Sequence, residues 1–272
     1  MDFAVVLCAG LGVLIGLILA LTGAGGGVLA VPLLIFGLQM RVSDAAPVAL
    51  FAVGISAALG AAMGLRSAHV RYRAAALIAA LGFIGAPAGL WLGRRIPNAP
   101  LMLVFAAVLA YSALRMFTQA RMAQAGSGLP AHERRAPCTF DPAEGRLRWT
   151  PACARALGGA GLVAGLLSTL LGVGGGFVIV PALVRVTDLD MKSVTATSLA
   201  VIALISAGSI GLTWVAGHTI LWSAALPFAA GAVVGLLVGR RIALIVSGRQ
   251  LQQTFAIVGL FVAVVLVYRS QA

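Results

Sequence analysis

The chain is organised around two matching stretches, GAGGGVLAVP at residues 23–32 and GVGGGFVIVP at residues 172–181. The second stretch follows the first at an offset of 149 residues. Two shorter matches follow in the same order: ISA at 55–57 and 205–207, and GRRI at 93–96 and 239–242. Each match alone is weak evidence. Three matches in one order indicate an internal duplication, so we expect two structural repeats.

The composition of the 272-residue chain is that of an integral membrane protein. Hydrophobic residues make up 61% of it, charged residues only 10%, and the mean hydropathy is +1.07. A soluble domain carries about 25% charged residues, so this chain has too few polar side chains to cover a water-soluble globule. The same numbers exclude a disordered chain and a small disulfide scaffold. The 34 glycines have no Gly-X-Y period, which excludes collagen.

Ten apolar segments are candidates for helices. They cover residues 3–21, 27–38, 44–65, 74–93, 99–118, 156–171, 176–187, 193–215, 221–239 and 250–268. Spanning a bilayer takes about 20 residues, and the segments 27–38 and 176–187 are shorter, which leaves half-helices and re-entrant hairpins as alternatives. We expect an all-α polytopic bundle of two repeats, residues 1–118 and 156–272, each with about four long helices and one short half-helix broken off by glycine. A hydrophilic linker at 119–155 joins them, and its Asp-Pro-x-x-Gly motif predicts a small β-hairpin.

The formal net charge of +12 comes from 19 Lys and Arg against 7 Asp and Glu. In a soluble protein this excess suggests nucleic-acid binding, but no hydrophilic basic domain exists here to hold a duplex, so we expect no nucleic-acid partner. In a membrane protein, Lys and Arg mark cytoplasmic loops. With five crossings per repeat and a cytoplasmic linker, fifteen Lys and Arg residues lie inside and four outside. If each glycine-interrupted pair of segments (3–38 and 156–187) makes one crossing, eleven lie inside and eight outside. The first arrangement is favoured, and it predicts inverted repeats with both termini outside.

Two cysteines, Cys138 and Cys153, flank the predicted hairpin in the linker. A cytoplasmic linker predicts that both are reduced, because disulfides are rare in that compartment. A disulfide, or a metal site that adds His132, is the alternative. A stable disulfide would count against the cytoplasmic placement of the linker.

Each of the two matching stretches begins with a glycine-rich loop, and a short apolar segment follows it. Non-helical backbone is tolerated at membrane depth only where protein or a water-filled cavity satisfies its polar groups, so each loop should break a helix inside the protein. The half-helix after the break starts with unpaired N–H groups and a partial positive charge, which favour an anion. Two such breaks related by inversion predict one central anion site. The alternative is that these glycines only allow close helix packing.

The chain resembles the TauE/SafE family of sulfite exporters and related small-anion permeases. The resemblance rests on the paired G-x-G-G-G-x-x-x-x-P motifs, the repeat layout, the Gly-Arg-Arg after the fourth segment of each half and the hydrophilic linker. It covers nearly the whole chain. It implies secondary transport of sulfite, a sulfonate or another organosulfur or carboxylate anion across a bacterial inner membrane. The motif identifies the family and not the substrate.

Carried onto this sequence, the resemblance implies a substrate site made of the two glycine loops and neighbouring hydroxyl groups. The expected site residues are Thr22, Gly25, Gly26 and Gly27 in the first half and Ser168, Thr169, Gly174, Gly175, Gly176, Thr195, Thr197 and Ser198 in the second. The polar run at 195–198 has the counterpart AAPV at 45–48, so the halves should be chemically unequal. Interhelical hydrogen bonding is the alternative role of that run. We expect no catalytic residue, no metal site and no cofactor; the expected partners are a small anionic substrate and the lipid bilayer, and a homodimer is left open.

The sequence identifies no residue that couples transport to an ion. Proton-coupled carriers often place an ionisable side chain within the membrane, but here Asp44 and Asp188 lie at segment edges and His69 and His218 at interfacial positions. Arg185, near the end of a short segment, either adds charge for an anion or extends its head group to the membrane surface. Release of a proton by the substrate and facilitated diffusion are both compatible with these residues. The rival functions are a structural membrane subunit without a site and a membrane enzyme, which would need His, Asp or Glu clustered at one membrane surface.

Overall fold

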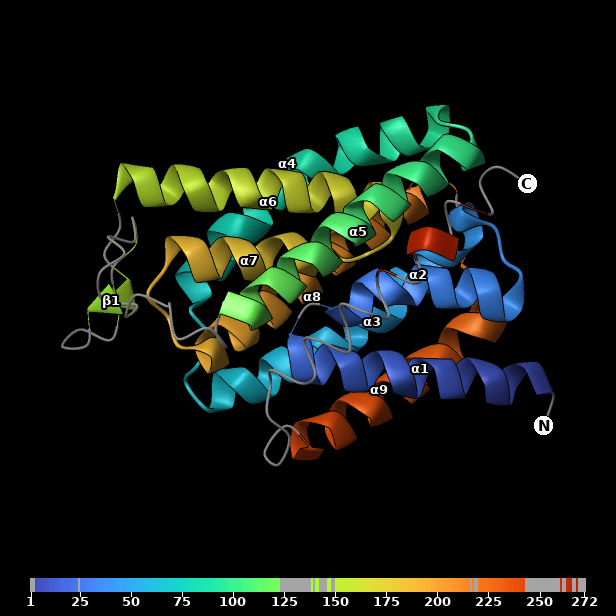
Figure 1. Cartoon of the computed structure of the whole chain (residues 1–272), viewed down its shortest axis with the longest axis horizontal. Helices are drawn as coiled ribbons and strands as arrows, with labels where there is room; N and C mark the ends of the chain where they lie inside the picture. The colour runs from blue at the N-terminus through green and yellow to red at the C-terminus, as the bar shows by residue number, and fades with distance from the viewer. Residues whose placement is uncertain are drawn as a thin grey trace.

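Figure 1 shows the computed structural model of the chain, a bundle of helices with a small β-element at one end. The structure describes residues 3–23, 25–122, 138, 140–141, 146–147, 150–215, 217, 220–242, 260, 263–265 and 268. The last predicted segment, 250–268, lies almost entirely outside these residues, and so do His132 and His218.

Helices form nearly all of the described structure. The helices of the first half are α1 Phe3–Thr22, α2 Gly25–Leu38, α3 Val42–Arg66, α4 Tyr72–Arg95 and α5 Asn98–Met122. Those of the second half are α6 Pro151–Leu171, α7 Gly176–Val186, α8 Met191–Val215 and α9 Trp222–Ile242. Within the described ranges, six helices are long and apolar enough to cross a membrane by length and composition, whereas α2 and α7 are short. The prediction of an all-α polytopic membrane protein is confirmed.

The pairs α1–α2 and α6–α7 are helical hairpins, and in each pair the second helix packs back along the first (Figure 1). The end of α7 is held at the start of α6, because Cys138 forms a β-bridge with Thr187 just after α7 and a disulfide with Cys153 in α6. With 11 residues, α7 is about 16 Å long, roughly half of the ~30 Å hydrocarbon core. The α6–α7 hairpin therefore leaves the bundle at the end where it enters. This contact pattern favours two passes by the α6–α7 pair over a single crossing.

The two halves pack around each other with matching partners. Helix α1 lies along α9 and α4 along α6, while α3 packs against α8 and α2 touches α7. Exchanging α1–α4 with α6–α9 leaves this set of contacts unchanged, as a two-fold axis between the repeats would. In Figure 1, α1 runs inward from the end marked N, and α6 runs inward from the opposite end, beside the β-strand. The opposite directions of these helices support the predicted inversion.

Glycines account for the close approach of the two long helix pairs. They are Gly12, Gly16, Gly231 and Gly235 in the α1–α9 pair and Gly85, Gly89, Gly161 and Gly165 in the α4–α6 pair. A methyl group added at any of these positions would run into the backbone of the partner helix. Lipid tails provide no hydrophobic drive between helices, so small residues that let backbones approach supply the packing. Close packing is therefore the role of these eight glycines, which lie outside the two loops.

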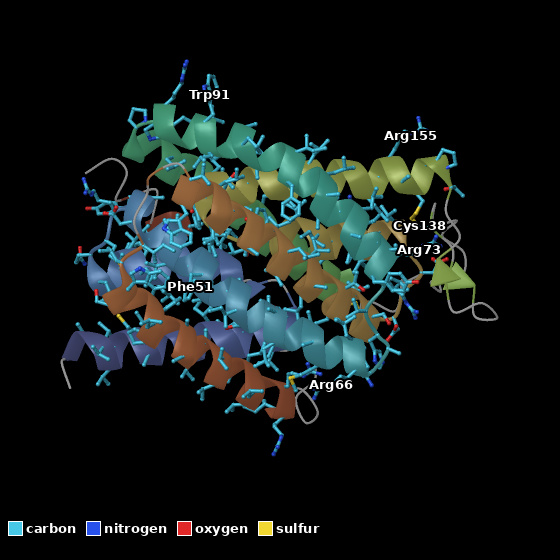
Figure 2. The ribbon with its side chains drawn as sticks, turned by 180° about the vertical axis from the view of Figure 1, so that it is seen from behind. Phe51, Arg66, Arg73, Trp91, Cys138 and Arg155 are labelled. Carbon is cyan, nitrogen blue, oxygen red and sulfur yellow. A yellow bond between two sulfur atoms is a disulfide. The ribbon has the colours of Figure 1, made fainter. Side chains whose placement is uncertain are left out.

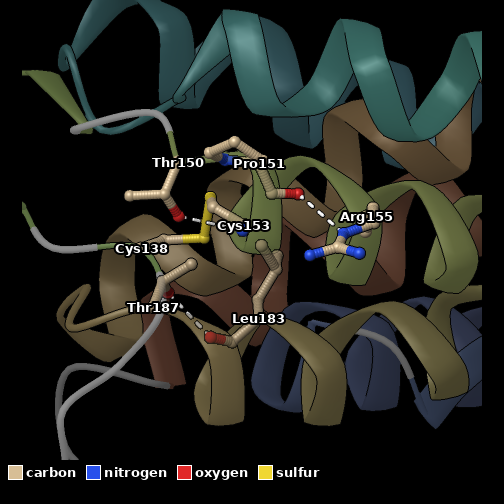
Figure 3. Close-up of a disulfide and its surroundings, with 7 residues drawn as sticks. All are labelled: Cys138, Thr150, Pro151, Cys153, Arg155, Leu183 and Thr187. Atoms are coloured by element: carbon tan, nitrogen blue, oxygen red, sulfur yellow. Dashed lines mark hydrogen bonds between the residues drawn. A yellow bond between two sulfur atoms is a disulfide. The ribbon is translucent and has the colours of Figure 1, made fainter.

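The linker contributes two short strands, β1 Phe140–Asp141 and β2 Arg146–Leu147, which pair antiparallel where the sequence predicts a hairpin. Cys138 and Cys153 are joined by a disulfide and both are fully buried (Figure 3). The Cys138 N–H also donates to the Val186 carbonyl over 3.0 Å. The prediction of reduced cysteines is therefore wrong for this structure, because the linker segment that pairs with the end of α7 brings Cys138 to the start of α6. Neither thiol of the pair remains free for a metal ion.

Basic residues of the described helices gather at the end of the bundle that carries the linker strands, called the linker end below. They are Arg66, Arg71, Arg73, Arg155, Arg185, Lys192, Arg240 and Arg241, at the ends of α3, α7 and α9 and the starts of α4, α6 and α8. Figure 2 shows Arg73 and Arg155 near Cys138, with Trp91 toward the opposite end. There the guanidinium of Arg95 stacks over the Trp91 ring, 4.2 Å from its centroid. The bundle thus has the charge asymmetry that the predicted topology requires.

Candidate functional site

Both glycine loops interrupt a helix, as the sequence predicts. The Gly23 N–H donates to the Leu19 carbonyl over 2.8 Å at the end of α1, and the Gly172 N–H donates to the Ser168 carbonyl over 2.9 Å at the end of α6. Gly23 and Gly172 both have φ +72°. This left-handed conformation ends many helices and is one that glycine adopts without strain. The two breaks therefore begin with the same helix cap.

The two breaks lie against each other inside the bundle. Gly27, in the first turn of α2, faces the second loop so closely that a methyl group on it would run into the Val173 carbonyl oxygen. Both residues are buried, and α2 and α7 also touch directly. The two helix starts that follow the breaks thus converge in the interior, which is the geometry that one central site needs.

The starts of α2 and α7 offer backbone donors with no acidic side chain beside them. Gly175 caps α7 in the left-handed conformation, with φ +71°, and Gly174 before it has φ +74°. The first N–H groups of a helix lack partners within the helix and carry a partial positive charge. Neither α2 nor α7 has an acidic residue in its first turn. An anion is the ligand that such a pair of helix starts favours.

The polar run of α8 contacts the first break, which belongs to the other repeat. Ser198 Oγ donates to the Gly23 carbonyl oxygen over 2.9 Å. Thr195 packs on Gly23, where an added methyl group would lie 2.6 Å from Thr195 Cγ2. In the first half, Ala46 of α3 packs on Gly172 in the same way. The halves are therefore unequal at the helix caps, since Thr195 packs on the cap glycine of the first break and Ala46 packs on the cap glycine of the second.

Three of the predicted hydroxyl groups have other partners. Thr197 Oγ1 accepts a hydrogen bond of 3.0 Å from the Arg71 N–H at the start of α4. Thr169 Oγ1 donates to the Ala86 carbonyl of α4 over 2.8 Å. Thr22 Oγ1 donates to a carbonyl of its own helix, also over 2.8 Å. Thr197, in the run for which interhelical hydrogen bonding was the alternative, thus makes a bond to another helix start, and so does Thr169 to α4.

The model of the family described as "Sulfite exporter TauE/SafE" matches residues 8–266, a range that includes both breaks. The chain belongs to this family. Two relatives of this TauE/SafE protein come from Xylella fastidiosa, and both are named "Probable membrane transporter protein". The relative from strain Temecula1 is 29% identical and the one from strain 9a5c 28% identical, each over 99% of this chain and 97% of its own length. No solved structure matches the chain.

The match to the family model confirms the resemblance drawn from the glycine motifs. Together with the six candidate membrane helices in the described ranges, it identifies the chain as a multi-pass member of a membrane transporter family. The TauE/SafE motif falls on the two breaks themselves, at residues 23–32 and 172–181. The structure shows what these positions have in common, which is a left-handed glycine cap followed by a helix start in the protein interior.

The Asp, His and Lys residues that the structure describes in this TauE/SafE chain lie in loops, in the linker strand or in the first turn of a helix. Asp190 and His69 meet at the linker end, from the loops before α8 and before α4. Partial burial raises the pKa of Asp190, but hydrogen bonds from Ser193 and the charge of His69 outweigh this and hold the pKa below its usual value. Within the described part of the chain, no group of three or more His, Cys, Asp or Glu residues could hold a metal ion. The breaks themselves present backbone donors and hydroxyl groups.

Sequence reasoning missed Ser206, which lies beside the second break of this TauE/SafE protein. Ser206 is fully buried and its Oγ has no hydrogen-bond partner among the described residues, and Ser168 shares both properties. A methyl group on Gly174 would lie 3.3 Å from Ser206 Oγ. The feature of the sequence that points to Ser206 is the match between 55–57 and 205–207, of which it is the middle residue. A match between repeats indicates duplication, however, and gives no reason to expect contact with a ligand.

Proposed function

We propose that this TauE/SafE chain is a secondary transporter that moves a small anion across a bacterial inner membrane, with the linker end toward the cytoplasm. The substrate is held between the two glycine breaks. The observation that carries the proposal is the contact of Gly27 with Val173, which brings two helix starts without acidic side chains to one buried place. Positive helix ends that face an anion at a repeat interface are a known design of transporters.

The donors at the breaks suit an oxyanion. Backbone N–H groups at helix starts and hydroxyl groups donate well to charged oxygen atoms. The family description names sulfite, and the two relatives are named only as membrane transporters. The substrate class we propose is therefore sulfite, a sulfonate, or a related organosulfur or carboxylate anion.

The helix packing favours an alternating-access mechanism. The hairpins α1–α2 and α6–α7 enter from opposite ends of the bundle (Figure 1), and their breaks meet inside it. The glycine-packed pairs α1–α9 and α4–α6 each join helices from different sequence halves, and pairs packed this closely move as units. We place the moving boundary between these two pairs, with α3 and α8 between them. Rocking at that boundary would open the site to one side at a time.

An inside-negative membrane potential can drive the export of an anion through such a site without a coupling ion. It supplies about 2.3 kcal/mol per elementary charge for each 100 mV. The described side chains that lie nearest to the glycines of the breaks are those of alanine, serine, threonine and aliphatic residues, none of which exchanges a proton near neutral pH. Facilitated anion export is therefore the transport mode we propose.

Flux in proteoliposomes tests this function. Vesicles that contain the purified chain are loaded with sulfite, sulfoacetate, taurine or thiosulfate, and efflux is followed at a set potential with and without a pH gradient. We expect saturable efflux of at least one anion, dependent on the potential and absent from protein-free vesicles. Folded protein that moves none of them would refute the proposal and favour a structural subunit. Chemical conversion of the anion without flux would indicate an enzyme.

A further inference from the structure

The second break carries hydroxyl groups that no described protein group binds. Ser168 and Ser206 are fully buried, and their Oγ atoms have no hydrogen-bond partner within the described ranges. Buried polar groups in proteins are almost always hydrogen-bonded, so each exception needs a physical explanation. A ligand that binds during the transport cycle is one such explanation.

Ser206 lies against the second break, and Ser168 belongs to the helix turn that this break ends. A methyl group on Gly174 would lie 3.3 Å from Ser206 Oγ, which places this hydroxyl of α8 against the loop. Ser168 lies in the last turn of α6, and its carbonyl accepts the hydrogen bond from Gly172 that ends the helix. The third contribution comes from α7, whose backbone N–H groups begin at Gly176. Ser206 Oγ therefore lies at this break, and Ser168 and the first N–H groups of α7 belong to the helix turns on either side of it.

The first half provides a comparison within the same chain. Ser56 is the counterpart of Ser206 in the ISA match and is equally buried, yet its Oγ donates to the Ala52 carbonyl over 2.9 Å. The residue 149 positions before Ser168 is Leu19. A serine at this point of the helix can therefore bind its own backbone, and Ser206 does not. The unpartnered hydroxyl is a property of the second break and not of the repeated sequence.

We propose that Ser206 and Ser168 are substrate ligands that donate hydrogen bonds to the oxygens of a sulfite or sulfonate group bound at the start of α7. This inference rests on the transport function proposed above and makes the second break the part of the site that recognises oxyanions. A sulfite or sulfonate group carries three oxygen atoms, and the break offers two hydroxyl groups together with helix-start N–H groups. Donors spread over three helices suit such a group better than they suit a chloride ion.

Binding to the purified full chain tests the assignment. Sodium sulfite and, separately, sodium methanesulfonate are titrated while thermal unfolding is followed, with sodium chloride as the control for ionic strength. Ser206→Ala removes the hydroxyl without adding volume, and we expect it to raise the apparent Kd for both oxyanions about tenfold, as for the loss of one hydrogen bond to a charged group. The matched control Ser56→Ala should change Kd by less than about twofold, because that hydroxyl already binds its own helix.

Unfolding without ligand separates a ligand role from a structural one. Ser206→Ala should keep or raise the unliganded Tm, since it removes an unpartnered buried hydroxyl, whereas Ser56→Ala should lower it. Ser168→Ala repeats the test at an independent position, in case Ser206→Ala does not fold. Wild-type Kd values in both variants, or an equal rise in Ser56→Ala, would overturn the serine assignment and leave the transport function intact. A wild-type chain that binds neither oxyanion would count against the transport function itself.

Discussion

Replacing Gly175 by alanine tests whether the second break must keep its shape for transport. Gly175 caps α7 with φ +71°, and a residue with a Cβ in this left-handed conformation costs about 1–2 kcal/mol. The added methyl group would also lie 2.7 Å from the Ala164 carbonyl oxygen and 3.0 Å from Ala164 Cβ. Ordinary contact begins at 3.4 Å, so the start of α7 has to move away from α6 by about 0.7 Å.

These two effects set the expected size of the change. Crowding of a packed interior costs about 1–3 kcal/mol, which with the conformational cost gives a destabilisation of about 2–5 kcal/mol. At 2–4 °C for each kcal/mol in a chain of this size, the Tm falls by about 4–20 °C. Flux should fall further than stability alone explains, because a displacement of about 1 Å at a reacting site can cost a hundredfold in rate. We expect sulfite flux per folded molecule to drop by about tenfold or more.

Gly217→Ala is the matched control for this variant. Gly217 lies in the loop between α8 and α9, has φ +81°, and has no atom within 4 Å of an added methyl group. Gly217→Ala therefore has the conformational cost without the crowding, so its Tm should fall by about 2–8 °C. Its flux per folded molecule should be unchanged. Both variants are measured as proteoliposome efflux, normalised to the folded protein recovered by size exclusion. Wild-type flux in Gly175→Ala, or an equal loss in the two variants, would refute the reasoning.

Three further substitutions test the packing, the first break and the linker. Gly165→Val should lower the Tm by about 2 °C or more, because the added side chain meets the α4 backbone. The control Gly159→Val, with no atom near its added methyl group, should leave the Tm unchanged. Equal Tm values in the two variants would contradict the packing argument. Ser198→Ala removes the hydrogen bond that holds the first break and should lower the Tm by about 2–4 °C; no change would mean that this bond does not stabilise the break. The disulfide closes a loop of 15 residues, so Cys138→Ser with Cys153→Ser should lower the free energy of unfolding by about 3 kcal/mol. Both this variant and the reduced wild-type chain should therefore have a Tm about 6–12 °C lower, and an unchanged Tm would mean that the bond does not stabilise the fold.

The helix breaks could be predicted from the sequence because their cause is local. Gly23 and Gly172 end α1 and α6 by adopting φ +72°, a conformation that other residues rarely adopt, so the glycine motif alone marks the place. The same holds for the apolar segments, whose length and composition decide that they are helices in a membrane. Features that depend on one residue and its neighbours along the chain are therefore recovered from the sequence.

Features that depend on distant contacts could not be predicted in the same way. Ser198 binds the Gly23 carbonyl from 175 residues away, so the sequence places this hydroxyl in the second half although it lines the first break. Ser56 and Ser206 share the same local sequence, yet only Ser56 binds its own helix. The ISA match therefore does not tell the two hydroxyl groups apart. Cys138 meets Cys153 for a similar reason, since the return of α7 along α6 brings the linker to the start of α6.

The orientation of the linker end is the point on which charge and cysteine chemistry disagree. Disulfides persist in the periplasm and are rare in the cytoplasm, whereas basic loops favour the cytoplasm. Turning the chain over would place fifteen of the 19 Lys and Arg residues outside and four inside. Cys138 and Cys153 are both fully buried, so their bond is shielded from thiols that would reduce it. A shielded disulfide on the cytoplasmic side is an exception, at one site, to the rarity of disulfides in the cytoplasm. The reversed orientation of the chain would break the positive-inside rule at most loops.

We therefore expect the linker end to face the cytoplasm, and two exposed arginines at opposite ends of the bundle allow a direct test. Arg155 lies in the first turns of α6 at the linker end, and Arg41 lies just before α3 at the other end. In a background that carries serine at Cys138 and Cys153, a membrane-impermeant maleimide applied to intact spheroplasts should label Arg41→Cys and leave Arg155→Cys unlabelled until the membrane is opened. The reverse pattern would place the linker in the periplasm, where the disulfide would be a permanent bond between the linker and the α6–α7 hairpin. Cytoplasmic labelling together with a disulfide detected in cells would mean that burial protects the bond from reduction.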